Sequence, residues 1–279
     1  MQDAAQRLEQ GVDALLESDN FARYLRAMAR FHNYSWGNVL LIVSQRPDAS
    51  RVAGYRTWQA LDRQVKRGER GITILVPRVR RIADAPEDDQ ATNDRAEGAV
   101  VSFGTGYVFD IAQTEGAELP TPPVVEALAT ATDRGAALYD ALVRWLERQG
   151  VAVQVSDDLG EANGAYAPRR KVVLVNRRLI GADQAAKTLA HEAAHYAASH
   201  TPDMPPADVE SVAEGSAYVI AAHFGLDSQG YSFGYIAQWA QDKTVLRRNL
   251  AAIQKTAQAV IDGLESADAV VGAHDLCAS

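Results

Sequence analysis

The chain has 279 residues, of which 47% are hydrophobic and 23% charged, a balance typical of proteins that fold around apolar cores and unlike that of disordered chains. No stretch approaches the roughly 18 consecutive apolar residues of a membrane-spanning helix, and the first ten residues are polar, so we expect a cytoplasmic protein. The single cysteine, Cys277, excludes an intrachain disulfide, so a metal site would have to use histidines and carboxylates.

Charge is divided unevenly along the chain. The net charge is −8, but residues 1–81 carry 14 Lys and Arg against 8 Asp and Glu, whereas the rest is strongly acidic. Segment 20–81 alone has a net charge of +10. Such a segment is a plausible footprint for a polyanion, although a solvated, salt-bridged surface has the same composition.

The first part of the chain predicts helices followed by a β-hairpin. Apolar spacing within residues 3–31 indicates two helices separated at 18–20, and further helices are expected over 35–45 and Thr57–Val65. β-branched residues predict strands over 71–79 and 100–111. Between these strands, the acidic stretch 83–98 predicts an inserted loop whose role stays open.

A proline-rich stretch, 119–123, predicts a boundary between domains 1–119 and 124–279. After it, we expect a helix over 124–149, strands over 151–155 and 171–176 with a turn at 161–164, and helices over 182–199 and 207–224. A helix or helix pair should cover 233–264, with the last fifteen residues frayed. The predicted fold class is α+β in two domains.

The strongest chemical signal is His191-Glu192-Ala-Ala-His195 on the helix expected over 182–199. Residues four apart share one helix face, so the two imidazoles can chelate one ion, which we expect to be Zn²⁺. Glu192 lies beside the metal, where its carboxylate can act as the catalytic base. The pattern also arises by chance on surface helices, so a third ligand is needed to support it.

The following helix supplies two candidates for that third ligand. Glu210 and Glu214 lie four residues apart on one face, as a gluzincin-type site requires. We assign Glu210 as the ligand and Glu214 as the acceptor of a ligand histidine's free N–H; the reverse assignment, or a merely solvated helix face, remains open. A metzincin would need a third histidine at position 201, which is Thr201, so that class is excluded.

Other residues in this half have weaker signals. His32, His200 and His223 are expected to be surface or structural histidines. Tyr166, Tyr231 and Tyr235 are candidate donors to an oxyanion, although each of these tyrosines is more often a packing residue. The strand pair before the metal helix could hold an extended peptide at its edge.

The basic half interleaves aromatic and cationic residues, a combination that suits single-stranded nucleic acid because bases stack on rings while Lys and Arg contact phosphates. The alternative is that Trp36 and Trp58 are core residues. The candidate DNA-binding residues are Tyr34, Trp36, Asn38, Tyr55, Arg56, Trp58, Lys66, Arg67 and Arg70.

Residues 20–119 resemble the N-terminal domain of the antirestriction protein ArdC family, through the segments FHNYSWGNVLLI, GYRTWQALDRQVKRGERGI and VFDIAQTEG. The second half resembles the zincin associated with ArdC, akin to ImmA/IrrE metallopeptidases, through KTLAHEAAH, ESVAEGSAYVI and GLDSQGYSFGYIAQWA. The resemblance implies a single-stranded-DNA-binding domain joined to a zinc-peptidase-like domain that protects incoming mobile-element DNA from restriction. It also supports Glu210 as the third ligand.

Three functions follow as hypotheses. The first is a single-stranded-DNA-binding antirestriction-type protein with a zinc metallopeptidase domain. The second is a regulatory zinc endopeptidase that cleaves a protein substrate such as a repressor or a restriction subunit. The third is a DNA-binding protein whose zinc is purely structural.

Overall fold

The computed structural model describes residues 2–15, 18–80, 100–119, 133–199, 205–226 and 243–275. The acidic stretch 83–98, the residues 120–123 of the expected linker, Tyr231 and Tyr235 lie outside these ranges. None of the described helices is both long enough and apolar enough to cross a membrane.

The chain divides into two units that alternate along the sequence. Unit 1 contains Met1–Gly11 and Leu40–Ala117, and unit 2 contains Val12–Val39 and Glu118–Ser279. One division between the units thus falls next to the proline-rich stretch at 119–123. Residues 12–39, however, are grouped with the second unit, although they precede the basic segment's strands in the sequence.

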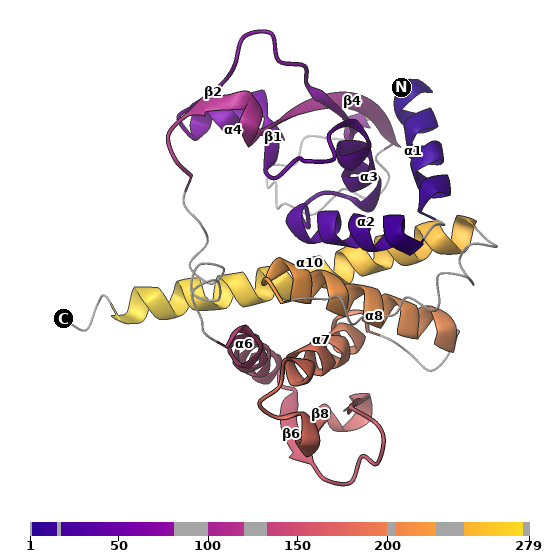
Figure 1. Ribbon diagram of the computed structural model, residues 1–279, viewed down its shortest axis with the longest axis vertical. Helices are drawn as coiled ribbons and strands as arrows, with labels where there is room; N and C mark the ends of the chain where they lie inside the picture. The colour runs from indigo at the N-terminus through magenta and orange to yellow at the C-terminus, as the bar shows by residue number, and fades with distance from the viewer. Residues whose placement is uncertain are drawn as a thin grey trace, which may run out of the picture. The chain divides into compact units, whose positions relative to one another are not determined.

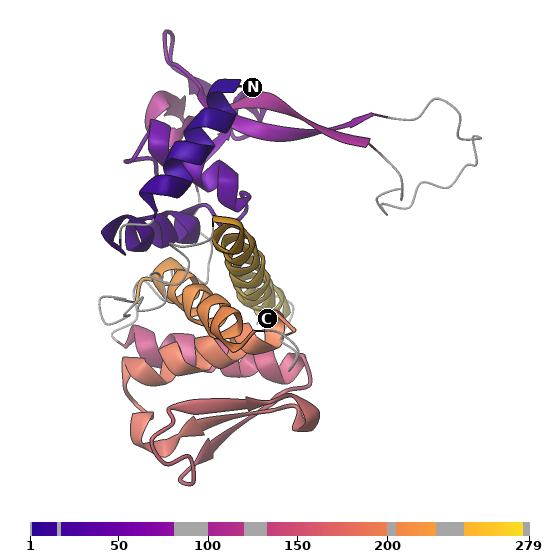
Figure 2. The same ribbon diagram turned by 90° about the vertical axis from the view of Figure 1, so that its right-hand side faces the viewer.

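Unit 1 is built on a three-stranded antiparallel sheet with the order β1-β4-β3. Its strands are β1 (Val52–Gly54), β3 (Ile72–Arg80) and β4 (Val100–Asp110). β3 and β4 form the hairpin predicted from their β-branched residues, with Ile72 paired to Val108, and Figure 2 shows them as a long twisted ribbon.

One face of this sheet is covered by helices of the same unit. Ile72, Ile74 and Val108 are buried on that face. The unit also includes most of α1 (Gln2–Ala14) and the second half of α3 (Trp36–Gln45). The Gln45 amide fixes α3 to β3, because it donates to the Thr73 carbonyl at 2.9 Å and accepts from the Thr73 N–H at 3.0 Å.

The helix predicted over Thr57–Val65 is only partly correct. α4 covers Tyr55–Ala60, after which Asp62 adopts a left-handed φ of 54° and the chain enters β2 (Arg63–Val65). β2 pairs with β5 (Thr114–Gly116) in a second, two-stranded sheet. Tertiary pairing with a strand fifty residues away, which a local pattern cannot reveal, ends the helix early.

Unit 2 contains a three-stranded sheet, order β6-β8-β7, packed against helices (Figure 1). β6 (Ala152–Ser156) and β8 (Val172–Asn176) are parallel, and β7 (Gly164–Ala167) lies antiparallel to β8. Among the described strands β7 pairs only with β8, so it forms one edge of this sheet.

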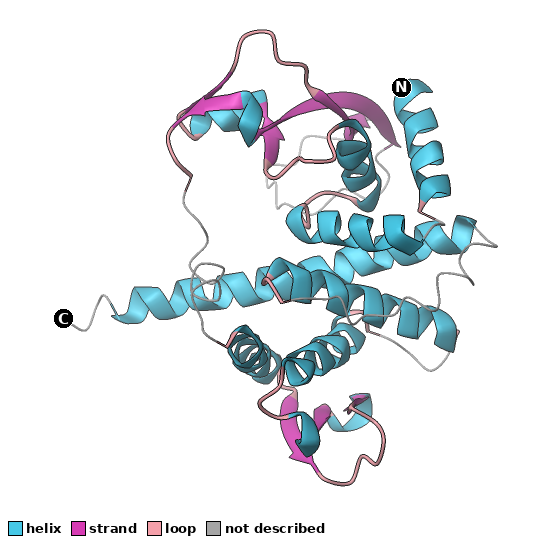
Figure 3. Cartoon of the chain, viewed as in Figure 1, coloured by secondary structure: helices cyan, strands magenta, loops and turns pink. Residues whose placement is uncertain are grey.

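The helices of unit 2 form two further layers behind that sheet (Figures 2 and 3). α6 (Arg134–Arg148) and α7 (Asp183–Ala197) contact the sheet, and α8 (Pro206–His223) packs on α7. α10 (Lys243–Asp275) packs on α6, α7 and α8, and α2 (Ser18–Arg30) packs on α8. The helices expected over 182–199 and 207–224 are therefore confirmed as α7 and α8.

Two boundaries in unit 2 differ from expectation. α6 begins at Arg134, where the Asp133 carboxylate accepts from the Ala136 N–H as an N-cap; residues 124–132 lie outside the described chain. The frayed C-terminus is a wrong prediction up to residue 275, because α10 continues to Asp275. Its buried residues include Leu250, Ile253 and Ile261.

Candidate metal centre

Helix α7 places the two predicted histidine ligands side by side. Burial of the small residues Ala190, Ala193 and Ala194 lets this helix approach its neighbours closely and leaves the histidine face toward α8. The Nε2 atoms of His191 and His195 lie 3.0 Å apart. Both side chains are half-buried, so the pair is partly shielded from solvent.

Helix α8 brings a carboxylate to the same point. The Glu210 carboxylate lies 3.4 Å from His191 Nε2 and 3.7 Å from His195 Nε2. One ligating atom from each of these residues lies within 4.8 Å of the others, so the three could hold a metal ion. Two histidines from one helix and a glutamate from the next thus converge as the sequence pattern predicts.

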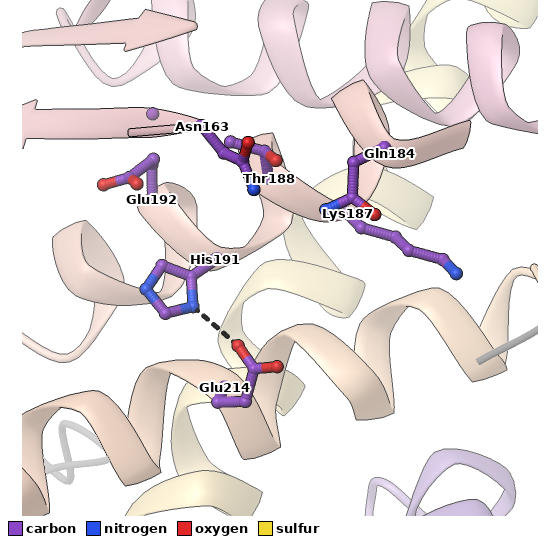
Figure 4. A pocket seen from close by; sticks show the side chains of 8 residues that line it. Asn163, Gln184, Lys187, Thr188, His191, Glu192 and Glu214 are labelled. Carbon is purple, nitrogen blue, oxygen red and sulfur yellow. Dashed lines mark hydrogen bonds and ion pairs between the residues drawn. The ribbon is translucent and has the colours of Figure 1, made fainter. Parts of the chain in front are cut away.

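Glu214, one turn further along α8, contacts the other nitrogen of His191. Its Oε2 lies 3.1 Å from His191 Nδ1, the contact drawn as a dashed line in Figure 4. A carboxylate there keeps the proton on Nδ1 and turns the lone pair of Nε2 toward His195 and Glu210. Of the two assignments left open by the sequence, this geometry favours Glu210 as the candidate ligand.

The donor set fits a divalent cation. Tetrahedral coordination at roughly 2.0 to 2.1 Å requires ligand atoms about 3.3 Å apart, close to the observed separations. Two imidazole lone pairs facing each other at 3.0 Å repel unless a proton or a cation lies between them. Burial lowers the pKa of His191, but hydrogen bonds with Glu210 and Glu214 outweigh that effect and raise it to about 10. Because of this raised pKa, the metal-free His191 ring keeps a proton on Nε2, at the position where a cation would bind.

Glu192 lies beside the histidines and is buried between α7 and β7. Burial raises the pKa of its carboxyl to about 7, although His191 and the Tyr166 backbone N–H oppose the rise. At neutral pH the group is therefore close to equal populations of its acid and base forms, which suits a group that both accepts and returns a proton.

Gly164, the first residue of β7, makes room for that carboxylate. A Cβ at this position would lie 2.7 Å from Thr188 Cγ2, 3.0 Å from Glu192 Oε1 and 3.1 Å from the Leu174 carbonyl oxygen. Any other residue would displace the strand or the glutamate. In the sequence this glycine is visible only as part of a predicted turn, so its role here was missed.

A pocket of about 310 Å³ opens over these groups. Figure 4 shows His191 and Glu192 on α7, with Glu214 on α8 pointing toward His191. Its wall is mostly polar, and it is lined by Asn163, Gly164, Gln184, Lys187, Thr188, His191, Glu192 and Glu214. The edge strand β7 contributes Gly164 to this lining, so the pocket adjoins the edge of the sheet that no other described strand covers.

Of the candidate oxyanion donors, only Tyr166 belongs to the described residues. Its ring packs edge-on against Tyr196 of α7 with 6.0 Å between centroids, and burial raises the pKa of its hydroxyl. The edge-on contact with Tyr196 favours packing, the alternative that the sequence left open for this ring. Its backbone N–H, by contrast, hydrogen-bonds the Glu192 carboxylate.

Two other histidines of unit 2, His32 and His223, form a separate cluster, whereas His200 lies outside the described residues. His223 of α8 donates through Nδ1 to the Ala29 carbonyl at 2.8 Å, and its Nε2 lies 3.0 Å from Glu265 of α10. His32 is buried, and its ring packs edge-on against that of His223 at 4.8 Å. His32, Asp262 and Glu265 also bring ligating atoms within 4.8 Å. These contacts join α2, α8 and α10, as expected of structural histidines.

The candidate DNA-binding residues are divided between the two units. Tyr34, Trp36 and Asn38 belong to unit 2, whereas the other six belong to unit 1. All three are half-buried, and the Trp36 carbonyl accepts from the Tyr24 hydroxyl at 2.8 Å.

Trp58 requires a correction. It is 2% exposed, and its indole N–H donates to the Phe109 carbonyl at 2.9 Å. A ring buried in this way cannot stack on a base, so Trp58 is a core residue, the alternative raised by the sequence. Within unit 1, the solvent-exposed candidates are Tyr55, Arg56, Lys66, Arg67 and Arg70.

Comparison with known proteins identifies a similarity in the first part of the chain, which includes residues of both units. Residues 2–109 match the N-terminal domain of the anti-restriction factor ArdC. An uncharacterised Bacillus anthracis protein, pXO2-81, is 24% identical over 90% of this chain and 48% of its own length. The uncharacterised Sinorhizobium fredii protein y4eC is 45% identical over 25% of this chain and 23% of its own. The chain thus spans half or less of the length of these curated relatives.

Two solved structures share the fold. The metal-free crystal structure of antirestriction protein ArdC from plasmid R388 is 20% identical, with a TM-score of 0.50 over 83% of this chain and 85% of ArdC. The Mn(II)-bound structure of the same protein is 18% identical, with a TM-score of 0.55 over 92% and 97% of the two chains.

The chain therefore has a mixed α and β fold similar to that of ArdC. Residues 2–109 match the model of the ArdC N-terminal domain, the similarity that the sequence segments predict for this part of the chain.

Proposed function

We propose that unit 2 is a metal-dependent peptidase, with His191, His195 and Glu210 as ligands of a divalent cation and Glu192 as the catalytic base. The observation that carries the proposal is the convergence of these three side chains within 4.8 Å beside a buried carboxyl whose pKa is about 7. Zn²⁺ is the proposed ion on the basis of its preference for histidine and carboxylate ligands, and the Mn(II)-bound ArdC structure makes Mn²⁺ the alternative.

A divalent cation held there would supply Lewis acidity that polarises a peptide carbonyl and acidifies water. The protein's own part begins with Glu192, which accepts a proton from the attacking water and returns it to the leaving amine. Glu214 keeps the proton on His191 Nδ1, and the Tyr166 N–H holds the Glu192 carboxylate in place. The edge of β7 that no other described strand covers offers backbone groups to an extended peptide beside the pocket.

The test pairs metal content with proteolysis. Wild type, Glu192→Gln and His191→Ala/Glu210→Ala are compared by elemental mass spectrometry and by cleavage of a mixed peptide library. We expect about one ion per wild-type chain, an unchanged content in Glu192→Gln with cleavage lost, and metal lost in the double variant. A metal-loaded wild type that cleaves nothing would favour a structural ion.

A second function is proposed for the basic part of the chain, namely binding of single-stranded DNA. It is supported by the ArdC domain match, the net charge of +10 over 20–81 and the exposure of Lys66, Arg67 and Arg70. Charge reversal at these three positions should weaken binding of a labelled oligonucleotide and flatten its dependence on salt. Unchanged binding would remove these residues from the interface.

Together these activities describe an antirestriction-type protein that protects incoming mobile-element DNA, with a restriction subunit or repressor as the proposed protein substrate. Transfer of an unmodified plasmid into a restricting host, with and without the protein, tests the protective role. If the Glu192→Gln variant protects as well as the wild type, proteolysis is not part of protection.

A further inference from the structure

The sheet of unit 1 leaves one face open, and that face is aromatic. Phe103 and Tyr107 on β4 are 55% and 62% exposed, and Tyr55 at the start of α4 is 45% exposed. The opposite face of the same strands is buried through Ile72, Ile74 and Val108. Large rings that stay exposed on a sheet gain no hydrophobic stabilisation from burial, unlike the side chains of the opposite face. A contribution to folding stability therefore does not explain why aromatic residues occur here.

The rings are aligned along the strand. Phe103, Thr105, Tyr107 and Phe109 alternate with inward residues and so share one face. At about 3.3 Å per residue, Tyr107 and Phe109 are spaced roughly 7 Å apart and Phe103 and Tyr107 roughly 13 Å. These intervals match an extended single strand, whose bases can separate, rather than a duplex with bases stacked inside.

Small residues lie next to the aromatic rings of β4 and leave their faces uncovered. Gly71 lies beside Tyr107 and Phe109, and a Cβ there would fall 2.9 Å from Tyr107 Cβ and 3.2 Å from Phe109 Cζ. Tyr55 extends the aromatic row, since its ring meets that of Phe109 edge-on at 6.4 Å. On β3, Thr73 lies opposite Tyr107, which places a small residue next to the large ring.

Cationic residues adjoin one end of this row. Lys66, Arg67 and Arg70 are exposed on the segment that leads directly into Gly71 and β3. The Lys66 amine also donates to the Ala112 carbonyl at 3.0 Å, just beyond β4. Positive charge beside exposed rings is complementary to a chain of phosphates with unpaired bases.

We infer that the open face of the β1-β4-β3 sheet, with Phe103, Tyr107 and Tyr55 as stacking rings, is the site where single-stranded DNA binds. This inference rests on the proposed DNA-binding function. The stacking role predicted from the sequence for Trp58, which is buried, is assigned instead to exposed rings on β4. In the sequence the alternation Phe103, Thr105, Tyr107, Phe109 was the available signal, but it was interpreted only as a strand.

The test uses the full-length chain and a fluorescein-labelled (dT)20 oligonucleotide in an anisotropy titration at several salt concentrations. Phe103→Ala/Tyr107→Ala should weaken binding by at least tenfold while leaving the salt dependence unchanged, because stacking is removed and no cation is lost. Tyr107→Trp should retain binding. Val155→Ala/Ile180→Ala, which truncates side chains that are 39% and 47% exposed in unit 2, is the matched control.

The possible outcomes distinguish an error in the assigned binding face from an error in the proposed DNA-binding function. If the wild type binds and Phe103→Ala/Tyr107→Ala binds equally well, DNA binding stands and this face is excluded. If the wild type does not bind (dT)20 at low salt, the proposed function and the inference both fail. If the double variant instead changes only the sedimentation behaviour of the protein, the face is a contact between copies, and the inference is overturned. Equal melting temperatures establish that the variants fold.

Discussion

Gly164 is the residue on which the position of the candidate base depends. We expect Gly164→Ala to destabilise the protein by about 1 to 3 kcal/mol, because the new methyl group would overlap Thr188 Cγ2 and the Leu174 carbonyl oxygen. The measurement is thermal or denaturant unfolding of the metal-free protein. Adding Thr188→Ser to the Gly164→Ala variant removes the methyl group that makes the closest contact. The double variant should therefore recover part of the lost stability.

Gly54→Ala is the control for this substitution. A Cβ on Gly54 meets only Thr57 Oγ1, at 3.9 Å, so this variant should unfold close to the wild type. A Gly164→Ala protein as stable as Gly54→Ala would show that β7 and α7 adjust without cost, and Gly164 would then have no special role.

The protonation of His191 predicts a pH dependence of metal binding. The pKa of about 10 means that the metal-free site holds a proton on this ring at pH 8, and an ion must displace the proton from Nε2. Binding should therefore release about one proton, and the apparent affinity should rise with pH by up to tenfold per unit below the pKa.

Calorimetric titration with Zn²⁺ at pH 8, in buffers of different ionisation enthalpy, measures this release. Glu192, with a pKa of about 7, is mostly ionised at that pH and adds little. Glu192→Gln should therefore release the same number of protons as the wild type. Binding without proton release would mean that His191 is already neutral or is not a ligand.

At the scale of elements, the sequence predicts the helices whose formation depends on residues close together in the chain. α7 and α8 follow from helical spacing, and because a helix fixes the i, i+4 geometry, the convergence of His191 and His195 follows from the sequence as well. That Glu210 and not Glu214 faces both histidines depends on how α8 packs on α7. Helical spacing puts both acids on one face and cannot distinguish them.

The sequence pattern does not predict features that depend on contacts between residues far apart in the chain, such as strand pairing and side-chain burial. β2 ends the helix expected over Thr57–Val65 only because β5 lies beside it. Trp58 and Tyr107 both occur in aromatic segments of unit 1, yet one is 2% and the other 62% exposed. Burial depends on which face of the sheet or helix is covered, and composition does not contain that information.

At the scale of the whole molecule, the two candidate sites belong to different units. The proposed metal ligands His191, His195 and Glu210 lie in unit 2, and the proposed stacking rings Phe103 and Tyr107 lie in unit 1. The division of charge does not coincide with the units, because the basic excess lies in residues 1–81, which contribute to both units, and the acidic excess lies in the residues after 81. A polyanion is thus attracted to one part of the sequence and a cation to the other.

Metal binding should stabilise the folded chain and leave DNA affinity unchanged. An ion at about 100 times its dissociation constant adds roughly 2.7 kcal/mol to the free energy of unfolding, which chelation with EDTA should remove as a fall in melting temperature. His191→Ala/His195→Ala should show no such fall. His223→Ala, which alters a histidine of unit 2 outside the proposed ligands, should keep the metal-dependent shift.

The same chelation also tests whether the two sites are coupled. If they are independent, the affinity for (dT)20 is equal with saturating Zn²⁺ and with EDTA. If metal changes that affinity, DNA must change the metal affinity by the same factor, since coupling between two binding sites is reciprocal. The melting temperature of the metal-free chain, measured on the same preparation, distinguishes coupling in the folded protein from partial unfolding, because unfolding would place that temperature below the assay temperature.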